Sequence, residues 1–288
     1  MMLKVLVWQV SNDTSFKDKA IKILEQQHNG IEIVGEAVNE NIAKVDGGGQ
    51  YDVLLCVGAK KFGMSKITAD AHKLNLPEEK LLGDWIVCIP GFTLEKYRHL
   101  QRSQLSIISK NCFGGFISNL MGLPFRSPFI NMTVRDEREC IVLYRNLHSY
   151  IHLPPVLKGT QFEHILKFDY PIYRIVDVDI HMNHYRDFDE ALAKWNERKQ
   201  RINWDNLFVM MFTDKKEILE QFDELPYGKK VCFVSFKSNL PSAWYLNPKI
   251  AGDNYLWEAV NHFGMGRTVY YDPFDMLLYG KKTPLIDM

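Results

Sequence analysis

Short apolar runs that alternate with helical segments are the feature that most limits how this chain can fold. The segment YDVLLCVGA (51–59) is continuously apolar and bounded by turn residues, which is typical of a strand buried on both faces. Further strand signals lie at 4–10, 30–38 and 80–90, with helical patterns at 15–27 and 67–75. This alternation predicts an α/β fold, with a Rossmann-like parallel-sheet domain over residues 1–103.

The sequence does not decide whether this first domain binds a ligand. The first strand runs into WQVSNDTSF, which lacks the GxGxxG pattern of dinucleotide sites, and VGAKKFG offers only the loose pair Gly58 and Gly63. A plain scaffold sheet and a nucleotide-sugar pocket at the carboxyl ends of its strands are both compatible with this pattern. We predict no cofactor.

Strand and helix patterns return after residue 103. Helical spacing marks 187–202 and 216–225, and strand patterns mark 176–185, 207–214 and 229–237. The stretch 123–170 is rich in proline and aromatic residues and is less regular. We expect a second α/β domain over residues 104–288.

Composition restricts the classes of partner and compartment. The 35 Lys and Arg residues equal the 35 Asp and Glu residues, so no global field favours nucleic acid. No apolar run reaches the roughly 18 to 20 residues that span a bilayer. The five cysteines are scattered without a CxxC pair. Among the nine histidines, His181 and His184 are closely spaced, but on a strand they would lie on opposite faces. We therefore expect a cytoplasmic protein without a transmembrane segment or metal, and the oligomeric state stays open.

The stretch SIISKNCFGG (106–115) places a cysteine where a strand runs into a helix. Asn111 is a competent helix cap, and Cys112 would then sit in the first turn, where the helix N-terminus lowers a thiol pKa. Its backbone N–H could hold an oxyanion, and Gly114 would let a substrate approach closely. The alternative is that Cys112 is a small core residue.

A histidine and an acid could complete a nucleophilic site. In IVDVDIHMNHY, strand alternation puts Val176, Val178, Ile180, Met182 and His184 on one face, whereas His181 falls on the polar face. This favours His184 over His181 as the base. Asp214, at the end of the next strand, is the expected third residue, with Asp205 as the alternative. Asp214 could instead cap the helix that follows it.

Three arginines are candidates for substrate binding. Arg198 and Arg201 lie one turn apart on the helix at 187–202, a spacing that suits phosphate or carboxylate, although a salt-bridged surface gives the same pattern. Arg126 lies with Ser127 between two prolines, in a rigid loop that could form one wall of a cleft.

The motifs taken together resemble a known bacterial family. They are SIISKNCFGGFISNLMGLPFRSPFINM, IHMNHYRDFDEALAKWNERKQRINWDNLFVMMF and FDELPYGKKVCFVSF. Over about residues 104–240 the chain is similar to domains of unknown function labelled exopolysaccharide biosynthesis protein and found among capsule genes. The family's Asn-Cys-Trp-Gly-Gly matches here with Phe113 in place of tryptophan, its histidine matches His184, and its Trp-x-x-Arg-x-x-Arg run ends at Arg198 and Arg201. The family is distantly similar to papain-like cysteine enzymes.

Three functions follow as hypotheses. The resemblance implies an enzyme of surface-polysaccharide biosynthesis that transfers or hydrolyses an acyl group through a Cys-His pair, with Cys112, His184 and Asp214 as catalytic residues. Its substrate would be a carbohydrate or an activated sugar, bound by Asn111, Gly114 and the three arginines. The alternatives are a glycosyltransferase-like or nucleotide-sugar-binding protein and a non-catalytic carbohydrate-binding protein.

Overall fold

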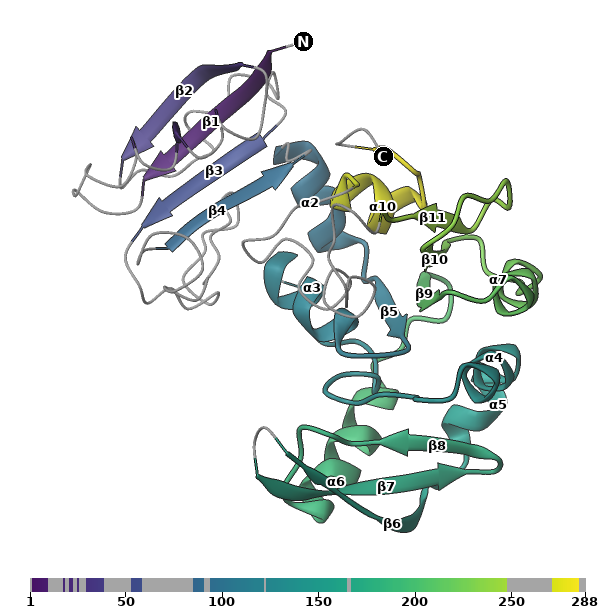
Figure 1. Ribbon diagram of the computed structural model, residues 1–288. Helices are drawn as coiled ribbons and strands as arrows, with labels where there is room; N and C mark the ends of the chain where they lie inside the picture. Colours follow the sequence, from purple (N-terminus) through teal and green to yellow (C-terminus); the bar gives the residue numbers. More distant parts are fainter. Residues whose placement is uncertain are drawn as a thin grey trace. The chain divides into compact units, whose positions relative to one another are not determined.

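The computed structural model describes residues 2–9, 18, 21–22, 25, 30–38, 53–58, 85–90, 94–121, 123–164, 167–247 and 271–284. The chain forms two compact units, whose elements are labelled in Figure 1. Unit 1 comprises Met1–Ser103, Ile117–Pro124 and His262–Asp287, and unit 2 comprises Gln104–Phe116, Phe125–Asn261 and Met288. Ile117–Pro124 and His262–Asp287, which were expected in the second domain, therefore belong to the first unit.

Unit 1 is built on a four-stranded sheet. Its elements are β1 (Leu3–Gln9), β2 (Ile31–Val38), β3 (Val53–Gly58), β4 (Trp85–Pro90), α2 (Leu94–Arg102) and α10 (Pro273–Tyr279). The strand order is β2-β1-β3-β4; β1 pairs in parallel with β2 and β3, whereas β4 runs antiparallel to β3. The prediction that all strands of this sheet are parallel is thus wrong for β4. An antiparallel strand at the edge of a sheet needs no helical crossover to join it to its neighbour.

The helices expected in this unit are only partly visible. Residues 18, 21–22 and 25 of the first expected helix are helical. The second, at 67–75, lies outside the described residues. No helix among the described parts of the chain has the length and apolar character needed to cross a membrane.

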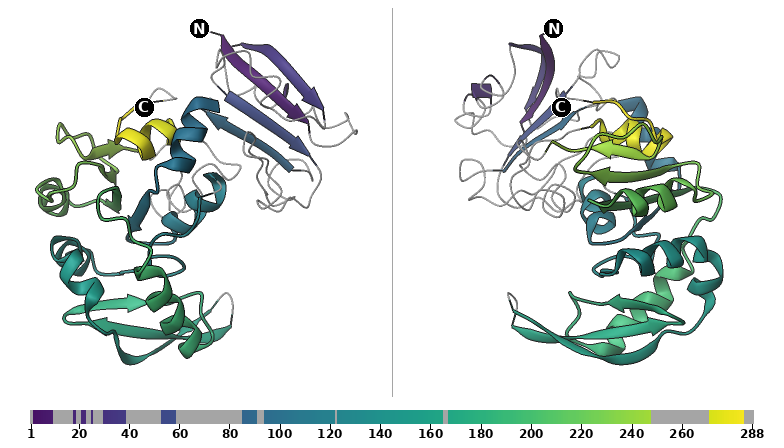
Figure 2. Two further views of the ribbon diagram at one scale, coloured as in Figure 1. Left: turned by 180° about the vertical axis from the view of Figure 1, so that it is seen from behind. Right: turned by 45° about the vertical axis from the view of Figure 1, so that its right-hand side comes forward.

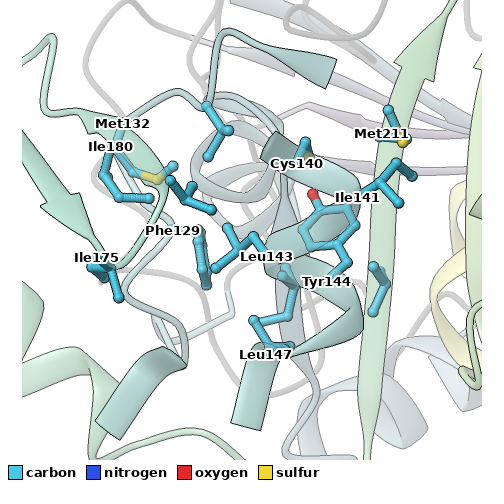
Figure 3. Packing of buried hydrophobic residues seen from close by; sticks show 14 of the residues in the cluster. Phe129, Met132, Cys140, Ile141, Leu143, Tyr144, Leu147, Ile175, Ile180 and Met211 are labelled. Atoms are coloured by element: carbon cyan, nitrogen blue, oxygen red, sulfur yellow. The ribbon is translucent and has the colours of Figure 1, made fainter. Parts of the chain in front are cut away.

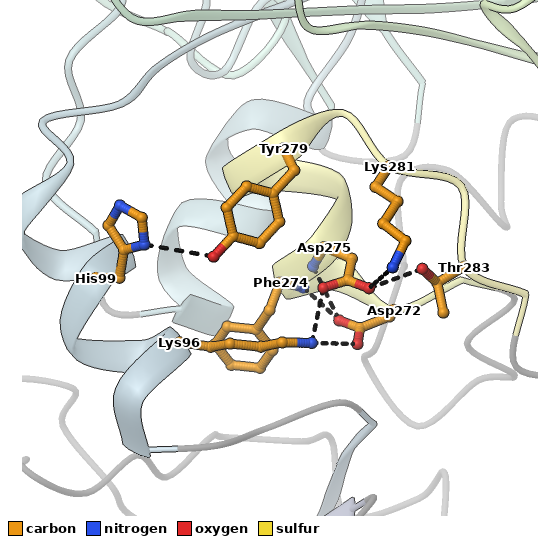
Figure 4. A network of polar contacts seen from close by, with 8 residues as sticks. All are labelled: Lys96, His99, Asp272, Phe274, Asp275, Tyr279, Lys281 and Thr283. Atoms are coloured by element: carbon orange, nitrogen blue, oxygen red, sulfur yellow. Dashed lines mark hydrogen bonds and ion pairs between the residues drawn. The ribbon is translucent and has the colours of Figure 1, made fainter.

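A polar network joins α10 to α2 (Figure 4). Asp272 caps α10, since its carboxylate accepts the backbone N–H groups of Phe274 and Asp275 at 2.8 and 3.0 Å. Lys96 from α2 lies 3.0 Å from Asp272 and 2.7 Å from Asp275. Because both carboxylates are buried, this lysine supplies the positive charge that their burial requires.

Unit 2 contains a parallel and an antiparallel sheet. In chain order its elements are β5 (Ser106–Ser109), α3 (Phe113–Met121, which continues into unit 1), α4 (Glu137–Arg145), α5 (Leu147–His152), β6 (Val156–Glu163), β7 (Phe168–Ile175), β8 (Val178–His181), α6 (Phe188–Lys199), β9 (Leu207–Thr213), α7 (Lys216–Asp223), β10 (Lys230–Val234) and β11 (Ala243–Tyr245). The first sheet has the order β11-β10-β9-β5, and all its strands are parallel. The segments that follow β5 and β9 therefore leave the sheet at one edge.

The second sheet, β6-β7-β8, is antiparallel, and α6 packs against β7 (Figure 2). The strand expected over 176–185 is shorter than predicted. Val176, which alternation put on an apolar face, lies in the turn between β7 and β8 with φ of 57° and is 60% exposed. The strand ends at His181, which is only 9% exposed, so the face that alternation marked as polar is buried at this residue.

The irregular stretch 123–170 supplies much of the unit 2 core. It forms α4, α5 and β6 and begins β7, none of which the sequence pattern predicts. Phe129, Cys140, Leu143 and Tyr144 from this stretch pack with Ile180 and Met211 from the two sheets (Figure 3). The buried Tyr144 hydroxyl donates to the Met210 carbonyl oxygen at 2.8 Å, so its polar group is satisfied.

Candidate active site

Thr133 and Val134 bring two strand ends together. The Val134 N–H donates to the carbonyl oxygen of the residue that follows β5, at 2.9 Å. Thr133 exchanges two backbone hydrogen bonds of 2.9 Å with His181, the last residue of β8. Because this link fixes the ends of β5 and β8 side by side, the residues that leave them, Cys112 and His184, can meet.

Cys112 lies immediately before α3. The Asn111 side-chain oxygen accepts the Phe113 N–H at 3.2 Å, and the Ser109 hydroxyl accepts the Gly114 N–H at 3.0 Å. Asn111 therefore caps the start of α3, as expected. These two N–H groups are satisfied within the corner, so neither is directed at the thiol.

His184 lies in a turn, not on a strand. The turn is closed by the Tyr185 N–H, which donates to the Met182 carbonyl oxygen at 2.9 Å. Asn183 and His184 are its two central residues. Behind the turn, Arg198 donates to the Tyr185 hydroxyl at 2.7 Å, so α6 fixes the position of this turn.

The Cys112 sulfur lies 3.2 Å from Nε2 of His184, within the range of a sulfur hydrogen bond. Cys112 is 4% exposed, whereas His184 keeps part of its surface open to solvent. Burial raises the pKa of Cys112 to about 12, which a hydrogen bond from the Asn183 side chain offsets only in part. The lowered thiol pKa expected at this helix start is therefore wrong.

The base of the pair is also uncharged at rest. Partial burial of the ring lowers the pKa of His184, and the charge of Glu163 opposes this shift. At neutral pH the pair thus consists of a thiol and a neutral imidazole. Such an imidazole can accept the thiol proton when a substrate is attacked, which is general-base activation of a nucleophile.

A pocket of about 430 Å³ lies near the pair in the fold, although neither Cys112 nor His184 lines it. It is lined by Lys110, Asn111, Thr133, Val134, Arg135, Glu163, Asn183 and Phe212. Two of these residues, Asn111 and Asn183, directly precede Cys112 and His184 in the chain. The pocket is therefore lined by the residue that precedes each member of the pair.

The pocket lining has two positively charged residues and one negatively charged residue. Lys110 lies 3.4 Å from Glu137, and its Nζ is 4.5 Å from the centre of the Phe212 ring. Burial of Glu137 opposes its ionisation, but the hydrogen bond from Lys215 and the charge of Lys110 outweigh this and lower its pKa. Glu137 is shared between Lys110 and Lys215, so the pocket lining, with Lys110, Arg135 and Glu163, carries a net positive charge.

His181 contacts Tyr170, which in turn binds Arg135 of the pocket lining. The Tyr170 hydroxyl accepts a 2.7 Å hydrogen bond from Arg135 and lies 3.5 Å from Nδ1 of His181. Burial, followed by the charge of Arg135, lowers the pKa of His181 to about 4. His181 is therefore neutral at physiological pH and has no contact with the Cys112 sulfur among the described residues.

Neither acid expected as the third residue contacts His184 within the described residues. Asp214 is exposed, and α7 has Lys215 at its N-cap with no side-chain hydrogen bond, so the capping role suggested for Asp214 is wrong. Asp205 is exposed, and its N–H donates to Asn203 at 3.2 Å. The carboxylate that acts on the His184 ring is Glu163, at the end of β6.

Tight packing at Gly114 leaves no room for a side chain. A Cβ there would lie 2.9 Å from the Ser109 hydroxyl oxygen, so this side is filled by protein. Arg126 is half-buried, and its Nε has no hydrogen-bond partner among the described residues. It is absent from the pocket lining.

The two helix arginines have protein partners. Arg198 is only 9% exposed and lies over the Phe125 ring, 5.4 Å from its centre. Arg201 is exposed, pairs with Glu197 and donates to the Phe125 carbonyl oxygen at 3.4 Å. Neither arginine lines the pocket, and their role in anion binding remains a prediction.

Three site residues escape the sequence reasoning: Asn183, Glu163 and Thr133. Asn183 adjoins the candidate histidine and could have been noticed, but strand alternation placed it on the opposite face. Glu163 and Thr133 lie in the stretch that showed no regular pattern, so no sequence signal marks them. Among the described residues, no group of three or more His, Cys, Asp or Glu side chains could hold a metal ion.

Comparisons with known proteins identify a family whose function is unknown. Residues 87–280 match the family described as "Domain of unknown function (DUF1919)", a range that includes both Cys112 and His184. A protein of Haemophilus influenzae described as "Uncharacterized protein" is 32% identical over 187 residues, which are 62% of this chain and 84% of that protein. The chain therefore belongs to the DUF1919 family of domains of unknown function.

Proposed function

We propose that this chain is a cysteine-dependent enzyme that transfers or hydrolyses an acyl group. The observation that supports this proposal most directly is the 3.2 Å separation between the Cys112 sulfur and His184 Nε2. A buried thiol beside a partly exposed histidine, with a pocket lined by the residue that precedes each of them, suits nucleophilic catalysis.

The reaction begins with attack of the sulfur on an acyl carbonyl. As the Sγ–C bond forms, the thiol proton passes to Nε2 of His184 and the carbonyl electron pair moves to the oxygen. Collapse of this adduct breaks the bond to the leaving group, which takes the proton from His184 and leaves a thioester on Cys112. Water or a hydroxyl group then attacks the thioester while His184 accepts its proton. The Sγ–C bond breaks, the sulfur takes this proton from His184, and the acyl group leaves as a carboxylic acid or as an ester of the acceptor.

The oxyanion of the adduct needs hydrogen-bond donors. The backbone N–H of Cys112 donates to no acceptor within the described residues, and it adjoins the reacting sulfur. In the proposed reaction this N–H is one donor to the oxyanion.

We place the substrate among the carbohydrates of bacterial surface polysaccharides, with the reaction in the cytoplasm. The resemblance to proteins of capsule genes motivates this assignment. The hydroxyl groups of a sugar could use the polar atoms of Thr133 and Asn183 in the pocket that lack a partner among the described residues.

Finer fold assignments belong to the same proposal. The parallel set β2-β1-β3 supports a Rossmann-like first domain. The order of a cysteine before a helix and a histidine later in the chain supports a papain-like arrangement in the second. A parallel sheet also leaves nucleotide-sugar binding as an alternative for the first domain, which thermal-shift measurements with nucleotide sugars would test.

The test uses an O-acetylated oligosaccharide as the acyl donor. Wild-type protein should release acetate, or move the acetyl group to an added acceptor sugar, and the acetyl signals in the proton NMR spectrum report both outcomes. Cys112→Ser should abolish the reaction while retaining the fold by circular dichroism. Equal turnover by the wild type and Cys112→Ser would exclude the cysteine mechanism, whereas no turnover by either would exclude this substrate class.

A further inference from the structure

Asn183 shares its turn with the candidate base. Its side-chain amide lies close enough to the Cys112 thiol to lower the pKa of that thiol as a hydrogen-bond donor, and it lines the pocket. The turn closed between Met182 and Tyr185 therefore presents two side chains to one sulfur. His184 offers a proton acceptor, and Asn183 offers amide donors.

The other end of the Asn183 side chain lacks a partner. Its Oδ1 is buried and accepts no hydrogen bond within the described residues. The same is true of the Thr133 hydroxyl oxygen, and Thr133 lines the same pocket and is only 6% exposed. A buried polar atom without a partner costs about 1–3 kcal/mol, so two of them at one pocket point to partners supplied by a ligand.

We propose that Asn183 is a catalytic residue whose side-chain amide donates to the oxyanion formed when Cys112 attacks a carbonyl. This inference rests on the proposed function. In the adduct the carbonyl carbon is bonded to the sulfur, so its oxygen lies within reach of groups that contact the sulfur in the free protein. Once the Sγ–C bond has formed, the sulfur is a thioether and only a weak hydrogen-bond acceptor, so the Asn183 amide is free to donate to the oxyanion.

Asn183 and the Cys112 backbone N–H would then form a two-donor site. The first comes from the turn after β8 and the second from the corner after β5, and the Thr133 link fixes both. Donors held in place before the reaction stabilise developing charge without reorganisation, and removing one such donor costs about 100- to 1,000-fold in rate.

Two reagents separate this role from an effect on the thiol itself. Iodoacetamide reacts at a saturated carbon: the Sγ–C bond forms, iodide leaves, and no oxyanion appears. With p-nitrophenyl acetate the sulfur adds to a carbonyl, an oxyanion forms, and p-nitrophenol leaves with the acetyl group retained on sulfur. Both rates are measured at about pH 8 by intact-protein mass spectrometry with peptide mapping to Cys112.

Asn183→Ala should slow acetylation by about 100-fold more than it slows alkylation. Asn183→Asp, which keeps the shape but removes the donors, should slow acetylation at least as much. It also covers the case in which the alanine variant does not fold. Asn196→Ala, on the exposed face of α6, is the matched control and should leave both rates unchanged.

Equal slowing of both reactions, or no slowing of either, would overturn the role of Asn183 while leaving the Cys112 mechanism intact. Absence of any acetylation of Cys112 in the wild type would instead overturn the proposed function, and this inference with it. A selective loss of acetylation in both Asn183 variants supports the oxyanion role.

Discussion

The Cys112 sulfur and His184 Nε2 lie 3.2 Å apart, although the two residues are 72 positions apart in the chain. Burial holds the thiol pKa at about 12, and burial lowers the pKa of the imidazole. Both shifts favour the uncharged forms, so the pair is a hydrogen-bonded thiol and base. This differs from a preformed thiolate–imidazolium ion pair, which needs a thiol pKa below that of the histidine.

The first prediction concerns the pH dependence of thiol alkylation. Because the pKa of Cys112 is raised, the thiolate fraction should grow about tenfold per pH unit across neutral and mildly alkaline pH. The rate of Cys112 alkylation by iodoacetamide, followed by peptide mass spectrometry from about pH 6 to about pH 10, should therefore rise without a plateau. A fast rate that is already constant above about pH 6 would reveal an ion pair and contradict the resting state described here.

The second prediction assigns the carboxylate that acts on the base. Glu163 raises the pKa of His184 against the larger effect of burial, so Glu163→Gln should lower that pKa further. The measurement is an NMR titration of the His184 ring. Since a lower pKa keeps the imidazole neutral to lower pH, the titration midpoint should move toward acid.

The control for this experiment is Asp214→Asn. Asp214 is exposed and is not among the charges that shift the pKa of His184, so its replacement should leave the midpoint unchanged. A larger shift with Asp214→Asn than with Glu163→Gln would restore Asp214 as the third residue.

The third prediction compares two arginines on one helix. Arg198→Met removes the 2.7 Å hydrogen bond to the buried Tyr185 hydroxyl and should lower the free energy of unfolding by about 1–3 kcal/mol. Arg201→Met removes an exposed pair with Glu197 and should cost less than about 1 kcal/mol. Urea unfolding followed by tryptophan fluorescence measures both. The ordering would be refuted if Arg201→Met were the more destabilising change.

The fourth prediction concerns the glycine pair after Cys112. Gly114→Ala places a Cβ 2.9 Å from the Ser109 hydroxyl oxygen, whereas Gly115→Ala places it 3.4 Å from the nearest atom, a methyl carbon of Ile130. We expect Gly114→Ala to destabilise the protein by about 1–3 kcal/mol through overpacking, and Gly115→Ala to cost less. Thermal unfolding by calorimetry distinguishes them.

A double variant tests the cause. Ser109→Ala removes the oxygen that the new methyl group would meet, so combining it with Gly114→Ala should cost less than the sum of the two single changes. Additive costs would show that the contact with Ser109 is not the source of the destabilisation.

The cysteine corner was predictable because its signals are local. Asn111, an apolar helical repeat and a preceding strand pattern together place Cys112 at a strand–helix junction, and the structure has β5 end at Ser109 and α3 begin at Phe113. The partner histidine was predictable as a residue near a strand end. Its proximity to Cys112 depends on Thr133 and Val134, whose backbone bonds have no sequence signature.

The other features of the site could not be predicted from the sequence, because they depend on burial and on contacts between residues that are distant in the chain. Alternation gave His181 a polar face, yet its backbone pairing with Thr133 and its contact with Tyr170 bury it. Helical spacing showed Arg198 and Arg201 as a pair, but only the packing of α6 separates a buried arginine from an exposed one. The thiol pKa depends on desolvation more than on position at a helix start.

The most direct test of the central claim is single-turnover acetylation of Cys112 by p-nitrophenyl acetate in the wild type and in His184→Ala. The wild type should gain one acetyl group on Cys112. His184→Ala should form the same adduct at least about 100-fold more slowly, because no base accepts the thiol proton. Equal rates in the two proteins, or a folded wild type whose Cys112 stays unmodified, would contradict a reactive pair.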